Sequence, residues 1–217
     1  MIIKQNLNKI KSTLPEHVTL VAVSKTKPVS DLMEAYNAGQ RIFGENKIQE
    51  MAEKYEQMPK DIQWHSIGHV QRNKVKYMAK FVSLIHGVDS FKLLKEINKQ
   101  AQLNDRVIDC LLQIKIAQED SKFGMSANDA SALLQSDDFL NLKHINITGV
   151  MGMATFTDNT TQIENEFKYL KSTFEELKTA NCKLHTISMG MSGDYTLAID
   201  CGSTMVRVGS RIFGTRN

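Results

Sequence analysis

Short apolar runs alternate with longer amphipathic segments along the whole chain. The apolar runs are rich in β-branched residues and are bounded by polar or glycine-containing turns, which is typical of buried strands. The intervening segments carry helix signals, such as Ser30 and Asp31 before one amphipathic stretch and Gly39 after it. This order predicts βα units and a parallel sheet.

The pattern predicts eight strands separated by helices. The strands are expected over residues 18–25, 41–44, 64–68, 81–88, 107–116, 145–153, 183–188 and 205–209. The helices are expected over 30–38, 47–57, 71–80, 91–102, 127–135, 161–180 and 195–201. Eight strands favour a single (β/α)8 TIM barrel domain over residues 1–217, a length near the lower end for that fold. An open doubly wound sheet of six or seven strands fits the same pattern.

The first predicted strand ends on a lysine. Residues 18–23 are apolar, and Ser24-Lys25 follows them shortly before Pro28. Burial disfavours a charged amine and lowers its pKa, and a neutral amine can attack an aldehyde to form a Schiff base. Lys25 is therefore a candidate for covalent attachment of an aldehyde.

Serine and glycine gather after the last two predicted strands. Residues 188–194 hold two serines and two glycines just before a helix, and Gly209-Ser210 repeats the arrangement. Backbone N–H groups in such turns bind anions, and the loops after strands seven and eight are the usual phosphate site of a barrel. Each segment alone fits ordinary helix caps and turns. Both together at this position favour a phosphate site.

A Schiff-base lysine and a phosphate site together indicate a phosphorylated aldehyde, and pyridoxal 5′-phosphate is the commonest candidate. Arg207, in the last predicted strand, would then donate a hydrogen bond to the pyridine nitrogen and keep that nitrogen unprotonated, because a guanidinium does not lose its proton. A surface ion pair explains Arg207 equally well. A phosphosugar enzyme with a Schiff-base lysine, such as an aldolase, is a further reading of the same residues.

Composition and charge narrow the class of protein. The net charge of +3 gives little support to a nucleic-acid partner. Apolar runs fall short of the roughly 18 residues of a membrane span, and no signal peptide precedes the first strand. The three cysteines, Cys110, Cys182 and Cys201, lack metal-ligand spacing, and an odd number speaks against a disulfide framework. We therefore expect a cytoplasmic protein with no membrane segment and no metal site.

Five segments in this order resemble the pyridoxal phosphate homeostasis proteins, a family similar to the N-terminal barrel of alanine racemase. They are residues 21–26, 43–50, 64–74, 188–194 and 206–214. The resemblance runs from about residue 18 to the C-terminus. It implies a fold-type III barrel that binds pyridoxal 5′-phosphate (PLP) as an internal aldimine on Lys25.

The resemblance also implies two groups of residues around the cofactor. The phosphate would be held by Ser192, Gly209 and Ser210. The ring would be contacted by Arg207, Asn46 and Met189, with His69 bordering the site.

The resemblance further implies a carrier rather than an enzyme. Alanine racemase has a second, β-rich domain that supplies a tyrosine base from the partner subunit, and we expect no such domain after residue 217. Two-base proton transfer needs groups on both faces of the cofactor, and Lys25 is the one obvious base. We expect a monomer that buffers PLP and hands it to apo PLP-dependent enzymes. A weak amino-acid racemase is the alternative, and a pure interaction protein would leave the five segments unexplained.

Overall fold

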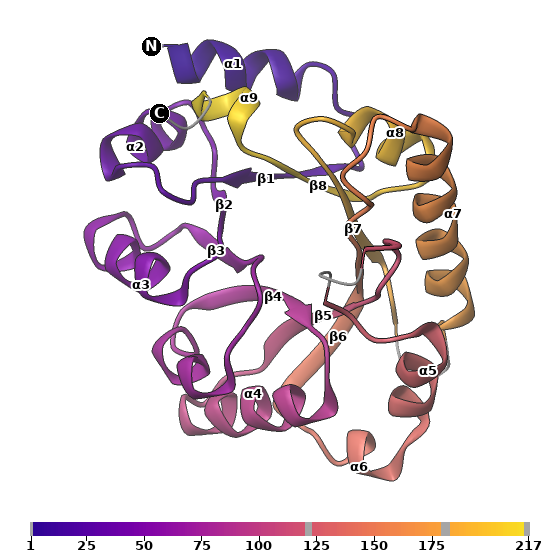
Figure 1. The fold of residues 1–217 in the computed structure, drawn as a ribbon. Helices are drawn as coiled ribbons and strands as arrows, with labels where there is room; N and C mark the ends of the chain where they lie inside the picture. The colour runs from indigo at the N-terminus through magenta and orange to yellow at the C-terminus, as the bar shows by residue number, and fades with distance from the viewer. Residues whose placement is uncertain (1, 120–122, 179–182, 215–217) are drawn as a thin grey trace.

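Eight parallel strands close into a barrel in chain order, and helices surround it (Figure 1). The computed structural model describes residues 2–119, 123–178 and 183–214. The barrel closes because β1 pairs with β8, which sets Val21 opposite Arg207 and confirms the predicted barrel over the open sheet. The strands are β1 (Thr19–Val23), β2 (Ile42–Glu45), β3 (Gln63–Ser66), β4 (Val82–Val88), β5 (Ile108–Gln113), β6 (Ile145–Met151), β7 (Thr186–Met191) and β8 (Met205–Val208).

The helices begin at signals that the sequence carries. The Ser90 hydroxyl accepts a hydrogen bond from the Leu93 N–H, and the Asn159 side chain accepts one from the Gln162 N–H. None of the helices in the described ranges has the length and apolar character needed to cross a membrane. The helices are α1 (Ile2–Lys11), α2 (Val29–Asn37), α3 (Ile48–Gln57), the 3-10 helix η1 (Arg72–Tyr77), α4 (Phe91–Leu103), α5 (Ala127–Gln135), α6 (Asp137–Leu140), α7 (Thr160–Glu176), α8 (Tyr195–Asp200) and α9 (Ser210–Phe213).

Several elements differ from the sequence prediction. Helix α1 was not predicted; it packs against α9 (Figure 1), and Asn6 Nδ2 donates to the Ile212 carbonyl at 3.1 Å. Residues 72–77 form a 3-10 helix in place of the α-helix expected over 71–80. Strand β7 covers 186–191, three residues later than expected. The last residues of the helix expected over 161–180 lie outside the described ranges, as does Cys182.

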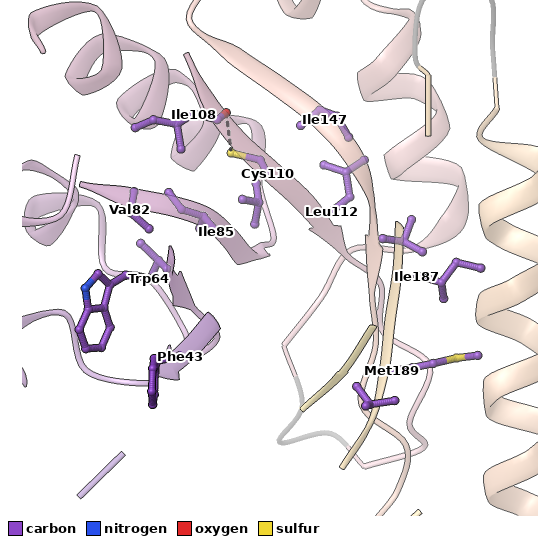
Figure 2. Close-up of a cluster of buried hydrophobic side chains, with 14 of the residues drawn as sticks. Phe43, Trp64, Val82, Ile85, Ile108, Cys110, Leu112, Ile147, Ile187 and Met189 are labelled. Carbon is purple, nitrogen blue, oxygen red and sulfur yellow. Dashed lines mark hydrogen bonds between the residues drawn. The ribbon is translucent and has the colours of Figure 1, made fainter. Parts of the chain in front are cut away.

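Apolar side chains fill two layers. The outer layer lies between the strands and the helices and contains Phe43, Trp64 and Met189, all fully buried (Figure 2). A smaller apolar cluster, which includes Val21, is formed by residues that alternate along the strands with those of the outer layer. Burial raises the pKa of the Cys110 thiol in the outer layer, which marks this cysteine as an unreactive core residue.

Candidate functional site

A cavity of about 690 Å³ lies at the carboxyl ends of the strands. Its volume is within the range of about 300–1,000 Å³ typical of small-molecule sites. Function in a barrel gathers at this end because loops from all the strands meet there. The lining residues include six of the seven predicted site residues, namely Lys25, Asn46, Ser192, Arg207, Gly209 and Ser210, and also His69.

Lys25 stands on a tight turn just after β1. The strand ends at Val23, and the Lys27 N–H donates to the Ser24 carbonyl at 3.1 Å to close the turn. Thr26 has a φ of 65°, a left-handed conformation that non-glycine residues rarely adopt. Lys25 is half-buried and lines the cavity, whereas the sequence pattern suggested that it ends a buried strand.

The loops after β7 and β8 are tied to each other. The Gly209 N–H donates to Ser192 Oγ at 3.1 Å, and both residues line the cavity together with Gly193 and Ser210. A Cβ built on Gly193 would meet no heavy atom within 4 Å, so this part of the backbone faces open space. The two loops thus form one small wall of backbone and hydroxyl groups, which suits a phosphate.

Met189 is the predicted site residue that the structure places elsewhere. It lies within β7 in the outer core (Figure 2), and Met191 lines the cavity. A bulge explains the difference, because Ser188 pairs with Met205 but Met191 pairs with Arg207, with Gly190 at a φ of 94° between them. The extra residue reverses the alternation of side chains at the end of the strand.

The expected anion-binding segment 188–194 is also shorter in the structure. Ser188 and Met189 belong to the strand, and the Met191 N–H donates to Asp194 Oδ1 at 2.5 Å. A backbone N–H that already donates a hydrogen bond to a carboxylate is not available to bind a ligand anion. The part of the segment that faces the cavity is therefore Ser192 and Gly193.

Arg207 is a buried cation in the cavity wall. Its Nη1 donates to the Ser188 carbonyl at 2.8 Å and to Ser188 Oγ at 2.6 Å, and Nη2 donates to the Gly152 carbonyl at 3.0 Å. Burial lowers the pKa of Arg207 to about 10. Among the described residues, no carboxylate lies within ion-pair distance of it, and it is only 4% exposed, so the surface ion pair considered above does not form. A ligand that accepts a hydrogen bond or carries negative charge would be stabilised here.

A chain of buried polar groups continues from Arg207 into the barrel. Ser188 Oγ lies 3.0 Å from His86 Nδ1, and His86 Nε2 lies 3.1 Å from His65 Nδ1. Burial lowers the pKa of His65 to about 3, and burial, His65 and Arg207 lower that of His86. Both imidazoles are therefore neutral and link Ser188 to β3. His86 lies inside β4 rather than at its end.

The opposite wall carries residues that the sequence analysis did not assign, except for His69. His69 Nδ1 lies 3.3 Å from Asp89 Oδ2, and the His69 ring stacks on Phe123 at 4.2 Å between centroids. The unassigned lining residues include Gln113 and Phe156. Gln113 is the last residue of β5, but the sequence predicted this strand to continue to residue 116, so its place at the strand end was not visible beforehand. No cluster of described His, Cys, Asp and Glu residues has the grouping needed to hold a metal ion.

Comparisons with known proteins agree in sequence and in structure. Residues 2–217 match the family described as "Alanine racemase, N-terminal domain". The chain is 39% identical to the "Pyridoxal phosphate homeostasis protein" of Haemophilus influenzae, with 100% of this chain and 97% of that protein covered. It is 38% identical to the protein of the same name from Schizosaccharomyces pombe, with 92% and 85% covered.

Solved structures share the fold. PipY of Synechococcus elongatus with PLP bound superimposes with a TM-score of 0.90 at 33% identity, covering 98% of this chain and 100% of PipY. An alanine racemase of Clostridium difficile has a TM-score of 0.78 at 17% identity, and 99% of this chain covers 60% of that protein. The similarity to alanine racemase concerns the fold of the barrel alone.

Proposed function

Because the chain belongs to the pyridoxal phosphate homeostasis proteins, within the alanine racemase N-terminal domain family, we propose that it binds PLP and carries or buffers it. One observation carries the proposal. The closed barrel brings Lys25, Arg207 and the loops after β7 and β8 to a single cavity. PipY, whose structure was solved with PLP bound, has the same barrel.

The residues around the cavity fit the chemical groups of PLP. PLP supplies an aldehyde that condenses reversibly with a primary amine. Lys25 offers that amine, and the wall of Ser192, Gly209 and Ser210 offers donors to a phosphate. The guanidinium of Arg207 can donate to the pyridine nitrogen, and Asn46 lines the same cavity. The buried charge of Arg207, which has no described carboxylate within ion-pair distance, suits an anionic ligand.

The same geometry argues against turnover of an amino acid. No tyrosine, cysteine or carboxylate of the described ranges lines the cavity, and the lining bases besides Lys25 are Lys27 and His69. A permanently protonated Arg207 at the pyridine nitrogen would keep that nitrogen unprotonated and weaken the cofactor as an electron sink. The relatives that match over nearly their whole length are named for homeostasis of the cofactor.

We infer that the protein works as a cytoplasmic monomer and passes PLP to apo PLP-dependent enzymes. Reduced Cys110 and Cys201 support a reducing compartment, and the rim of the cavity is open, with Phe156 94% exposed. Light scattering at micromolar protein concentration measures the molar mass and so tests whether the protein is a monomer. Incubation of loaded protein with an apo-enzyme tests the transfer, and recovery of that enzyme's activity no faster than with free PLP would contradict it.

Titration of the purified protein with PLP tests the proposed function. We expect the near-visible absorbance of a Schiff base to appear in the wild type and in a Lys80→Ala control, and to be lost in Lys25→Ala. A wild-type protein that develops no such band would overturn the proposal. Exchange of the α-hydrogen of L-alanine in deuterated water, with the loaded protein, would instead establish the racemase alternative.

A further inference from the structure

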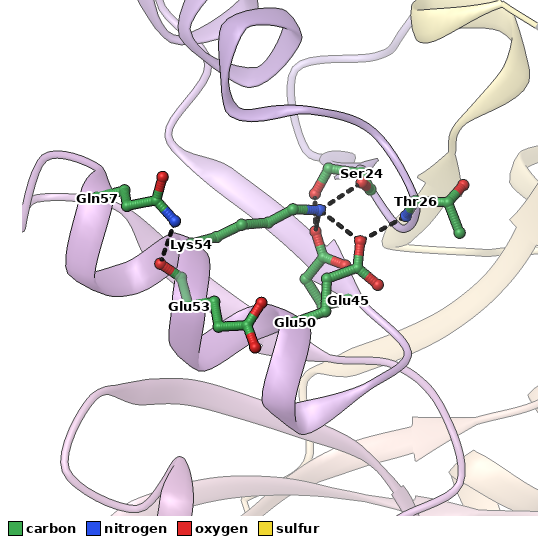
Figure 3. A network of polar contacts seen from close by, with 7 residues as sticks. All are labelled: Ser24, Thr26, Glu45, Glu50, Glu53, Lys54 and Gln57. Atoms are coloured by element: carbon green, nitrogen blue, oxygen red, sulfur yellow. Dashed lines mark hydrogen bonds and ion pairs between the residues drawn. The ribbon is translucent and has the colours of Figure 1, made fainter.

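A second lysine, Lys54 of α3, reaches the turn that carries Lys25 (Figure 3). Its ammonium donates to the Ser24 carbonyl at 2.8 Å, to Glu45 Oε1 at 2.7 Å and to Glu50 Oε1 at 2.8 Å. An ammonium has three protons, so these partners use all of them. The Lys54 side chain is only 6% exposed, and Lys54 does not line the cavity.

The two carboxylates in turn hold the residues on both sides of Lys25. Ser24 Oγ donates to Glu45 Oε1 at 2.6 Å, and the Thr26 N–H donates to Glu50 Oε1 at 2.6 Å. Thr26 has the left-handed φ of 65°, which a free turn would relax. Hydrogen bonds to charged groups are the strong ones, so this network fixes the backbone before and after Lys25.

Stability alone accounts poorly for this network. A buried ion pair is often no more stabilising than apolar side chains of the same volume. Glu45 Oε2 is buried and has no hydrogen-bond partner among the described residues, which is a further cost. The groups that the network does satisfy lie on the turn 24–26.

We propose that Lys54, together with Glu45 and Glu50, is a positioning residue that holds the turn 24–26 so that the amine of Lys25 meets the aldehyde of PLP. The proposal rests on the proposed function and assigns a role in it to residues outside the cavity. Covalent capture of PLP, which depends on the position of one nitrogen, should need the network more than binding of the phosphate and ring does.

The test compares PLP with 4′-deoxypyridoxine 5′-phosphate, which has the ring and phosphate but no aldehyde. Calorimetry gives the Kd of both ligands for wild type, Lys54→Met, Glu50→Ala and a Lys80→Met control. Lys80 suits as the control because its ammonium pairs with Glu56 Oε1 at the same 2.7 Å but is 55% exposed. Circular dichroism of each apo-protein reports folding.

In Lys54→Met we expect about 10- to 100-fold weaker binding of PLP, with the Kd of the deoxy analogue changed by less than about twofold. Glu50→Ala should also weaken binding of PLP but not of the deoxy analogue, to a smaller degree. If Lys54→Met does not fold, Glu50→Ala tests the proposal in its place. Lys80→Met should bind both ligands as the wild type does.

Two results would overturn the proposal. One is unchanged PLP affinity in the folded variants, and the other is equal weakening for both ligands, which would indicate general damage to the site. Failure of the proposed function would give a different result from either of these. In that case the wild type itself would bind both ligands alike and would form no covalent bond.

Discussion

At the scale of single residues, buried polar groups connect the cavity to the interior of the barrel. Arg207, Ser188, His86 and His65 form one hydrogen-bonded chain across β8, β7, β4 and β3. The chain holds the guanidinium in one orientation, because Arg207 also donates to two backbone carbonyls. A fixed guanidinium can present a donor to a ligand without first losing side-chain entropy.

The neutral histidines should make stability depend on pH. Burial lowers the pKa of His65 to about 3, while in the unfolded chain it is near 6.5. Between these values the unfolded state binds more protons, so stability is fully present above pH 6.5 and falls as pH drops toward 3. We expect a slope of up to about 1.4 kcal/mol per pH unit for each such histidine.

Urea unfolding of the apo-protein between pH 4.5 and 7.5 measures this dependence. His65→Gln should flatten the slope by about one proton. A His65→Gln variant with the wild-type slope would show that His65 takes up its proton in the folded state at the ordinary pH.

At the scale of elements, α3 is joined to the end of β1 by the network around Lys54. Removal of Lys54 leaves the Glu45 carboxylate fully buried without its cation, and burial already raises the pKa of this group. We expect Lys54→Met to cost about 3–5 kcal/mol in the free energy of unfolding at pH 7, whereas the exposed Lys80→Met control should stay close to the wild type. Urea unfolding of the apo-proteins gives both values.

The double variant Glu45→Met/Lys54→Met separates two causes of this loss. If the uncompensated carboxylate is responsible, the double variant should recover most of the stability of the wild type. A double variant as unstable as Lys54→Met would show instead that packing around the lysine stem dominates.

The elements also show which parts of the fold could be predicted from the sequence. Alternation of apolar runs and amphipathic segments was enough to predict all eight strands, because each strand is buried and has a helix or turn signal after it. The bulge at Gly190 was not visible, because nothing in the sequence says on which side of a strand one extra residue falls. Met189 was therefore predicted to line the site, whereas in the structure Met191 does so.

The polar interior was predictable only in part. His65 and His86 lie within strand-like runs, and their pairing depends on the registers of β3, β4 and β7, which are set by closure of the whole barrel. The network of Lys54 was missed for a similar reason: an amphipathic helix predicts a buried face, but not that a lysine on that face reaches a turn 30 residues earlier.

At the scale of the whole molecule, closure of the barrel creates the site. Pairing of β1 with β8 helps to set Lys25 beside Ser192 and Gly209, which come 167 and 184 residues later in the chain. Packing of α1 on α9 joins the two ends of the described chain (Figure 1). A ligand that contacts both β1 and β8 should therefore stabilise the folded barrel as a unit.

Thermal unfolding with and without PLP measures this coupling. Binding only to the folded state adds about 2.7 kcal/mol when the free ligand is at 100 times its Kd, which raises Tm by roughly 5–10 °C for a chain of this size. Lys25→Ala should show a smaller rise at the same PLP concentration, because its binding lacks the covalent bond. An equal rise in both proteins would contradict a contribution from Lys25.

Borohydride reduction of the PLP-loaded protein, followed by peptide mass mapping, tests the central claim most directly. The account predicts the mass of reduced PLP on the peptide that contains Lys25, and none on that of Lys54 or on any peptide of Lys25→Ala. A label spread over several surface lysines, or an unlabelled Lys25 in loaded wild-type protein, would contradict the assignment of this barrel as a PLP carrier tethered at Lys25.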